Sequence, residues 1–130
     1  MDASSSLAEA VQPLCKPTRW KGRAVRGLQP FTSDDAKLLA AISRGEFLIS
    51  GFRNGDLRPL LFGNADVLRD EKRRQSAKVT RLIRMLRAHG LIRKIPKTHR
   101  YRLTTNAHSA ITALTAAQHA TIKTLTQLAA

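Results

Sequence analysis

The sequence predicts an α+β fold that is mostly α-helical. Apolar residues recur every three to four positions, the helical period, within residues 32–44, 54–62, 65–89 and 105–128. Residues 91–103 instead alternate apolar with basic side chains on both sides of a turn, as a β-hairpin does. A chain of 130 residues with 42% hydrophobic residues suits one small domain with tails.

Residues 1–30 are predicted to form a flexible, basic N-terminal arm. Serines at positions 4–6 are followed by Pro13, Pro17 and Pro30, which interrupt any regular pattern. Trp20 lies in the same segment, and we expect it either to stay with the arm or to dock onto the domain. The cations of the arm are Lys16, Arg19, Lys21, Arg23 and Arg26.

The first helix is expected to begin at Thr32 or Ser33. Either hydroxyl can cap a helix N-terminus, and the two aspartates that follow suit the first turn. Gly45 is expected in the left-handed conformation that ends such a helix. The apolar run at 47–49 is short and β-prone, so it predicts a short strand or an extended link.

Residues 54–63 predict a second, shorter helix. Asn54 can open it, but Pro59 is tolerated best in a first turn, so a start at Asp56 is the alternative. Gly63 is expected to end the helix. The side that faces the core is expected to carry Leu57, Leu60 and Leu61.

The third helix is the strongest pattern in the chain. It is expected over residues 65–89, and Gly90 is expected to end it. Taking 100° per residue, one apolar side should be buried and a different side should present cations. The apolar side is predicted to contain Val79, Leu82, Ile83 and Leu86.

Two strands and a final helix complete the chain. Residues 91–95 and 101–103 are predicted to pair around a turn at 96–99, and residues 105–128 are predicted to form the last helix. The resulting order of elements is that of a winged helix-turn-helix domain, which we place at residues 31–104. In that arrangement the third helix is the recognition helix and the hairpin is the wing.

The net charge of +14 is concentrated in two blocks. Residues 1–26 carry a net +3, residues 27–65 balance to zero, and residues 66–102 carry +10. A balance of this kind indicates a polyanionic partner. Because the larger block coincides with the third helix and the hairpin, the sequence predicts that these elements contact double-stranded DNA.

Residues 76–104 contain a motif that combines helix, glycine turn and wing. It consists of Ser76, Val79, Thr80-Arg81, Leu82, Leu86, Gly90-Leu91-Ile92, the hairpin at 93–102, and Leu103-Thr104. This motif resembles the recognition-helix and wing segment of MarR-like and related bacterial winged-helix regulators, and the topological match extends over 34–104. The resemblance implies DNA binding. The chain departs from that family in its short, wholly basic wing and in lacking an evident N-terminal dimerisation helix.

Three groups of residues are the candidate DNA contacts. Arginine reads guanine and glutamine reads adenine in the major groove, while the other cations and hydroxyls bind phosphate. The alternative for each group is a solvated basic surface without a specific role. The recognition-helix candidates are Arg73, Arg74, Gln75, Ser76, Lys78, Thr80, Arg81 and Arg84, and the wing candidates are Arg93, Lys94, Lys97, His99, Arg100 and Arg102. The arm candidates are the five arm cations named above.

Residues 105–130 are a candidate dimerisation helix. Their narrow apolar stripe suits a second copy of the chain, and the alternative is a helix that folds back on its own domain. The stripe consists of Ile111, Leu114, Gln118, Ile122 and Leu125.

Several function classes are disfavoured by the sequence. The four histidines have no metal-ligand spacing, no nucleotide-binding or nucleophile motif occurs, and carboxylates are few, so we expect no metal, no cofactor and no enzymatic activity. Cys15 has no partner for an internal disulfide, and no signal or membrane-spanning segment is evident, so we expect a cytoplasmic protein. The expected role is a transcriptional regulator. The alternatives are an accessory DNA-binding module of a mobile-element or phage enzyme, which would include a fragment of a longer protein, and, less favoured, an RNA-binding protein.

Overall fold

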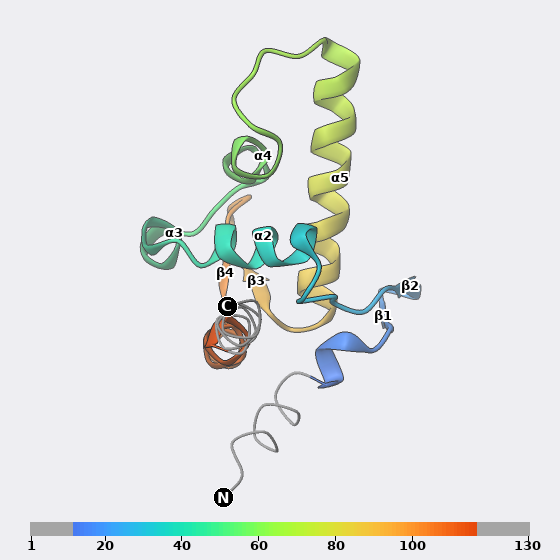
Figure 1. The fold of residues 1–130 in the computed structure, drawn as a ribbon, viewed down its shortest axis with the longest axis vertical. Helices are drawn as coiled ribbons and strands as arrows, with labels where there is room; N and C mark the ends of the chain where they lie inside the picture. The colour runs from blue at the N-terminus through green and yellow to red at the C-terminus, as the bar shows by residue number, and fades with distance from the viewer. Residues whose placement is uncertain (1–11, 117–130) are drawn as a thin grey trace, which may run out of the picture.

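The fold is α+β and mostly helical, with two short antiparallel hairpins (Figure 1). The computed structural model describes residues 12–116. Its elements are η1 Gln12–Cys15, β1 Thr18–Trp20, β2 Arg23–Val25, α2 Ser33–Ile42, α3 Gly45–Ser50, α4 Asn54–Phe62, α5 Arg69–Ala88, β3 Ile92–Lys94 and β4 Tyr101–Leu103, and residues 105–116 are also helical.

Helix α5 is the longest described element and lies along one side of the fold (Figure 1). Its predicted core face is confirmed, because Val79, Ile83 and Leu86 are buried and Leu82 packs against them. The helix ends before Gly90, whose φ of 72° is the left-handed conformation expected there. The apolar spacing therefore correctly predicted which face of α5 packs against the core.

The starts of α2 and α4 follow from local hydrogen bonds, and in α4 the Asp56 side chain accepts from the Arg53 amide at 2.8 Å. Thr32 is the N-cap of α2, and its Oγ1 accepts a hydrogen bond from the Asp35 amide at 3.4 Å, as predicted. Helix α4 begins at Asn54 rather than Asp56, so Pro59 lies inside the helix. Gly63 ends α4 with a φ of 86°.

Residues 47–49 form part of helix α3, so the prediction of a strand or extended link is wrong. The side chain of Phe47 is buried, and Gly45 begins this helix instead of ending α2. Short apolar runs fit a strand and a buried turn of helix equally well, which explains the error. The residue of this region that pairs with strand β4 is Phe52, not residues 47–49. Phe52 exchanges two backbone hydrogen bonds of 2.8 Å with Tyr101.

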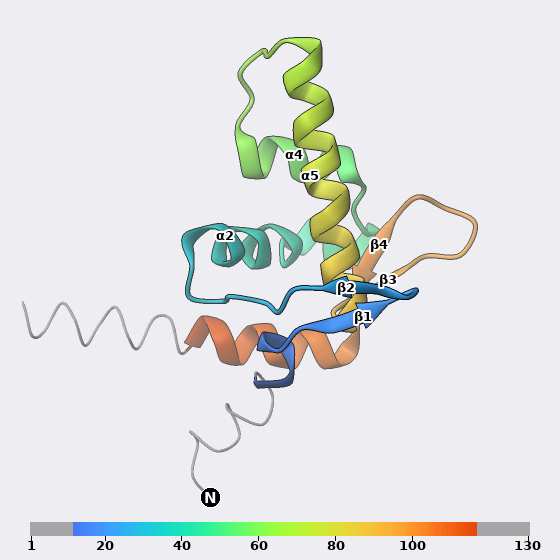
Figure 2. The ribbon, with the colours of Figure 1, turned by 90° about the vertical axis from the view of Figure 1, so that its right-hand side faces the viewer.

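Residues 12–30 are not a flexible arm but part of the folded domain. Strands β1 and β2 pair in antiparallel register, with Trp20 opposite Arg23, and Figure 2 shows this hairpin passing across the lower end of α5. Leu28 is only 1% exposed and belongs to the core, so the predicted domain boundary at residue 31 is also wrong. The rest of the predicted arm, residues 1–11, lies outside the described residues.

A bidentate ion pair joins this segment to helix α2. The two terminal nitrogens of Arg26 each lie 2.9 Å from a carboxylate oxygen of Asp35, which also accepts the Gln29 amide at 2.7 Å. The Asp35 side chain is only 3% exposed. Burial alone would raise the pKa of Asp35, but the hydrogen bonds from Arg26 and Gln29 outweigh it and lower that pKa. Arg26 is therefore a structural residue, not the arm contact that the sequence predicted.

The helix at residues 105–116 packs against its own domain. Ile111 is 5% exposed and Leu114 is 1% exposed, and both belong to the same core cluster as the α5 leucine and isoleucine side chains. The prediction that these two side chains form a dimer surface is therefore wrong, and the fold-back alternative describes them. The other predicted dimer residues, Gln118, Ile122 and Leu125, lie outside the described residues.

Replacing Asp35 by Asn should lower the free energy of unfolding at pH 7 by about 1–3 kcal/mol, because it weakens a buried, charge-assisted hydrogen-bond set. The folded pKa of Asp35 is lowered, so its contribution is complete above the unfolded value of about 3.9 and is lost as the pH falls through the folded value. Urea unfolding should therefore separate the two proteins more at pH 7 than at pH 3. The exposed neighbour serves as the control, and Asp34→Asn should change stability little. Equal Asp35→Asn differences at both pH values would contradict the role of this ion pair.

Candidate nucleic-acid interface

The outward side of α5 is cationic, and its N-terminal half extends past α4 (Figure 1). Arg74, Arg81 and Arg84 are spaced by seven and three residues, which places them opposite the buried stripe at 100° per residue. Arg73, Arg74 and Arg81 are exposed, and Arg84 is half-buried. The basic side is open at Arg73 and Arg74, whereas Arg81 and Arg84 border a hollow beside strand β2.

Carboxylates neutralise little of this surface. The single acidic contact of an α5 cation in the described residues joins Arg74 and Glu71 at 3.9 Å, with side chains 80% and 46% exposed. An exposed pair with so long a separation contributes little. Elsewhere in residues 12–116 only Arg26 and Arg44 form ion pairs with carboxylates. The cations of α5 therefore keep their charge available for an anionic partner.

Three of the predicted recognition residues make contacts within the fold or lie on its core-facing side: Gln75 and Ser76 are half-buried, and Thr80 is exposed but hydrogen-bonded to Asn54. Asn54 donates to the Ser76 carbonyl and to the Thr80 hydroxyl at 3.0 Å each, and it accepts from the Ser76 hydroxyl at 3.3 Å. Ser76 and Thr80 therefore hold α4 against α5. Gln75 lies four residues before Val79, on the core-facing side of the helix, and is half-buried. The sequence prediction missed these roles because the partner, Asn54, lies 22 and 26 residues away.

Lys78 lies on the opposite flank of α5 from the Asn54 contacts. Its ammonium nitrogen is 5.7 Å from the centre of the Phe62 ring, and its side chain borders a small hollow that also contains residues of α2. Lys78 therefore does not share one face with Arg73, although the sequence prediction grouped them in one recognition surface.

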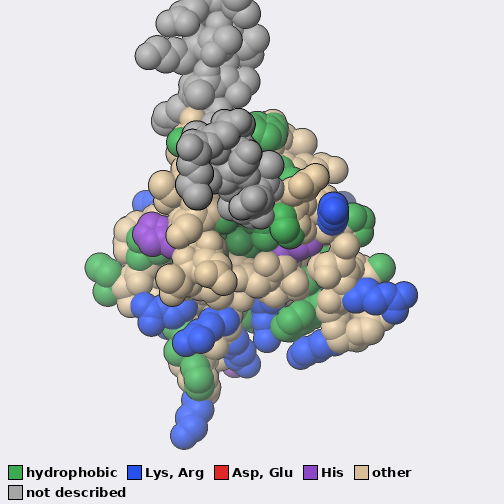
Figure 3. Space-filling model, turned by 90° about the horizontal axis from the view of Figure 1, so that it is seen from below, with side chains coloured by type: hydrophobic (Ala, Val, Ile, Leu, Met, Phe, Trp, Pro, Cys, Tyr) green, Lys and Arg blue, Asp and Glu red, His purple; other side chains and the backbone are tan. Residues whose placement is uncertain are grey.

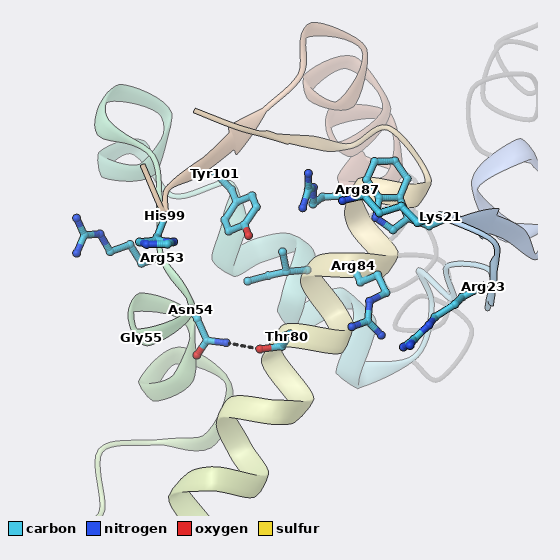
Figure 4. Close-up of a pocket in the computed structure, with 12 residues that line it drawn as sticks. Lys21, Arg23, Arg53, Asn54, Gly55, Thr80, Arg84, Arg87, His99 and Tyr101 are labelled. Carbon is cyan, nitrogen blue, oxygen red and sulfur yellow. Dashed lines mark hydrogen bonds between the residues drawn. The ribbon is translucent and has the colours of Figure 1, made fainter. Parts of the chain in front are cut away.

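A basic groove lies between the β1–β2 hairpin and the β3–β4 hairpin, with α5 as its floor (Figure 4). Its volume is about 600 Å³, and no Asp or Glu side chain lines it. In Figure 4, Arg23 and Arg84 lie on the β1–β2 side, and Arg53 and His99 lie at the other edge. The basic side chains that line the groove are Lys21, Arg23, Arg53, Arg84, Arg87 and His99.

Arg87 links the two walls of this groove. Its guanidinium carbon is 5.1 Å from the centre of the Trp20 ring in β1 and 5.6 Å from the centre of the Tyr101 ring in β4. Tyr101 in turn packs against Phe52, with ring centres 6.1 Å apart. One arginine thus joins both hairpins through cation–π contacts. The sequence prediction missed Arg87, and its only hint was the expectation that Trp20 could dock onto the domain.

The predicted wing residues lie on two faces of the β3–β4 hairpin. Arg93 pairs with Arg102, and Lys94 pairs with Tyr101, so alternation places Arg93 and Arg102 away from the groove that Tyr101 lines. Arg102 donates to the Leu48 carbonyl at 3.1 Å.

Arg100, another arginine of the β3–β4 hairpin, also forms a hydrogen bond within the fold. Arg100 donates to the Ser50 carbonyl at 3.4 Å. Arg100 and Arg102 therefore brace the hairpin against α3. Lys94, Lys97 and His99 remain exposed, and His99 lines the groove.

The predicted arm cations also separate into groups. Lys21 and Arg23 line the groove, whereas Arg19 pairs with Ala24 on the other face of the β1–β2 hairpin. Lys16 is exposed just before β1. Figure 3 shows Lys and Arg side chains gathered along one edge of the face seen from below, and no Asp or Glu side chain is visible on that face.

Within residues 12–116 no three His, Cys, Asp or Glu side chains come together as metal ligands. None of the helices in this part of the chain has the length and apolar character needed to cross a bilayer.

A comparison with protein-family models, curated proteins and solved structures finds no match to this chain.

Replacing Arg87 by Ala should loosen the β1–β2 hairpin, because each cation–π contact contributes on the order of 1 kcal/mol. Hydrogen exchange of the backbone amides in residues 18–25 should become several-fold faster. Arg73→Ala is the control, because it removes the same charge from the N-terminal half of α5, and no contact between Arg73 and an aromatic ring is found in the described residues. Equal exchange in both variants would show that Arg87 does not hold the hairpin.

Proposed function

We propose that this protein is a non-enzymatic DNA-binding protein built on a winged helix-turn-helix domain. Helices α4 and α5 are the helix-turn-helix pair, and the β3–β4 hairpin is the wing. The order of α2, α4, α5 and the two strands supports this assignment, as does the isolated β-bridge between Phe52 and Tyr101 of β4.

The observation that carries the proposal is the outward side of α5. A helix is about 10–12 Å across with its side chains, and the major groove of B-DNA is about 12 Å wide. The N-terminal half of α5 extends past α4, so its approach to a duplex is not blocked by α4 (Figure 1). Its exposed arginines have almost no carboxylate partners, so their charge is available to phosphates and guanine edges.

Helices α4 and α5 and the wing each have a role in this proposal. Arg73, Arg74 and Arg81 on α5 enter the major groove, where arginine forms bidentate contacts with guanine. The Asn54 hydrogen bonds fix the angle between α4 and α5. Lys97, at the exposed turn of the wing, contacts the flanking phosphate backbone.

Double-stranded DNA is a better partner than RNA for this geometry. The major groove of an A-form RNA helix is deep and narrow and excludes a helix such as α5. Sequence-specific RNA binding commonly stacks bases on several aromatic side chains. Trp20 and Tyr101 contact Arg87, which leaves Phe31, 64% exposed, as the one exposed Phe, Tyr or Trp side chain among the described residues. The same DNA-binding surface suits a transcriptional regulator and an accessory DNA-binding module.

Replacing Arg73 or Arg81 by Ala should weaken binding to a duplex selected from a random pool. The expected loss is about 1–3 kcal/mol where the side chain reads a base. Fluorescence anisotropy with labelled duplex measures the loss. Arg44→Ala is the control, because Arg44 precedes α3 on the side of the fold away from α5 (Figure 1) and should leave affinity nearly unchanged.

The same experiment separates the alternatives. Equal affinity losses in Arg44→Ala and Arg81→Ala would contradict the recognition role of α5. Selection of one defined sequence supports a regulator, and binding without sequence preference supports an accessory module. Tighter binding to duplex RNA than to duplex DNA would overturn the choice of partner.

Replacing Lys97 by Gly should reduce affinity for all duplexes similarly, because it removes one phosphate contact. The slope of log affinity against log salt should flatten by about one unit. Lys97 has a φ of 62°, a conformation that glycine adopts without strain, so the variant should unfold at a temperature at least as high as the parent. An unchanged salt slope in this stable variant would show that the wing does not touch phosphate.

A further inference from the structure

The β1–β2 hairpin has the features of a second DNA-contacting element. Its tip is Lys21 and Gly22, both with positive φ, and Arg23 follows directly. In Figure 2 this hairpin and the wing extend toward the same side of the molecule. The groove between them contains basic side chains from both walls and from α5, and no carboxylate lines it.

We propose that the β1–β2 hairpin is a second wing, and that the groove between the two wings holds the phosphate backbone of one DNA strand. This inference rests on the proposed DNA-binding function. The first wing and the N-terminal half of α5 contact the duplex as described above. The second wing adds Lys21 and Arg23 to that contact and closes the groove around Arg84.

Charge is the first argument for a phosphate ligand. Arg23 and Arg84 lie on the same side of the groove in Figure 4, with no carboxylate among the lining residues. Like charges that share a site repel each other, and an anion bound between them removes that repulsion. Arginine also binds phosphate oxygens in a bidentate manner, which suits the backbone of a nucleic acid.

The aromatic rings of the groove argue against a base as its occupant. Trp20 is in contact with Arg87 at 5.1 Å and with Lys21 at 5.8 Å, and Tyr101 is in contact with Arg87 at 5.6 Å. These rings are therefore engaged in cation–π contacts instead of offering a stacking platform. Their function in the groove is to hold the second wing at a fixed distance from the first.

The second wing is held in place before any partner binds. Arg87 connects its strand β1 to α5 and β4, and the Arg26–Asp35 pair fixes the residues that follow strand β2. The His89 ring nitrogen also lies 2.9 Å from the Arg26 carbonyl oxygen. A pre-positioned element loses less conformational entropy on binding than a flexible tail does.

A one-for-one comparison within the hairpin tests this inference. Arg23→Ala removes a charge that lines the groove, and Arg19→Ala removes the same charge from the other hairpin face, outside the groove. Anisotropy titrations with a duplex of about 20 base pairs at several salt concentrations give the salt slope for each variant. We expect the slope to fall by about one unit for Arg23→Ala and to stay unchanged for Arg19→Ala. Circular dichroism should show that both variants are folded.

The other possible results of this experiment distinguish failure of the second wing from failure of the DNA-binding proposal. Equal slopes in Arg23→Ala and Arg19→Ala overturn the second wing. If Arg81→Ala still weakens binding in that case, the DNA-binding proposal stands alone. If the parent protein does not bind the duplex at all, the DNA-binding proposal itself fails and the second wing with it.

An independent measurement uses the single tryptophan of the chain, Trp20, which lines the groove. Saturating unlabelled duplex should protect Trp20 from quenching by acrylamide, because a DNA strand covers the groove. Unchanged quenching at saturation would overturn the inference even if the salt slopes agree with it.

Discussion

The contacts of Arg87 with Trp20 and Tyr101 determine how the two hairpins of this protein are arranged. Three elements meet at this side chain: strand β1 near the N-terminus, helix α5 in the middle and strand β4 near the C-terminus. Without it, the β1–β2 hairpin would lose its cation–π contact with α5. The width of the basic groove, and with it the position of Lys21 and Arg23, depends on this cation and the two rings.

Two sets of polar contacts connect the other elements of the fold. The buried Asp35 carboxylate joins the N-terminal segment to α2, and the Asn54 side chain joins α4 to α5. A buried carboxylate is costly unless it is paired and hydrogen-bonded, and Asp35 has both an arginine and a backbone amide. The apolar core packs α2, α5 and the helix at 105–116 together, and it also includes Leu28, Phe47 of α3, Leu57 of α4 and Ile92 of β3.

The charge distribution separates structural cations from available ones. Arg26, Arg100 and Arg102 donate to groups of the protein itself, whereas Arg73 and Arg81 have no carboxylate partner in the described residues. A surface with so many unpaired like charges destabilises the folded chain by self-repulsion. A polyanion such as DNA removes that repulsion, which is the physical reason that the proposed function suits this chain.

The sequence by itself determined the elements whose signals are local. The apolar stripe of α5, its end at Gly90 and the β3–β4 hairpin all follow from residues a few positions apart, and each is present as predicted. The cap at Thr32 belongs to the same class of signal.

Only the tertiary structure decided which cations are available and which segments belong to the core. The contacting residues are far apart in the sequence. Trp20 and Arg87 are separated by 67 positions, Arg26 and Asp35 by nine, and Asn54 and Thr80 by 26. Periodicity within one element has no information about such partners. For the same reason the sequence assigned residues 12–30 to a flexible arm and Ile111 to a dimer surface, because an apolar stripe does not specify which surface will cover it.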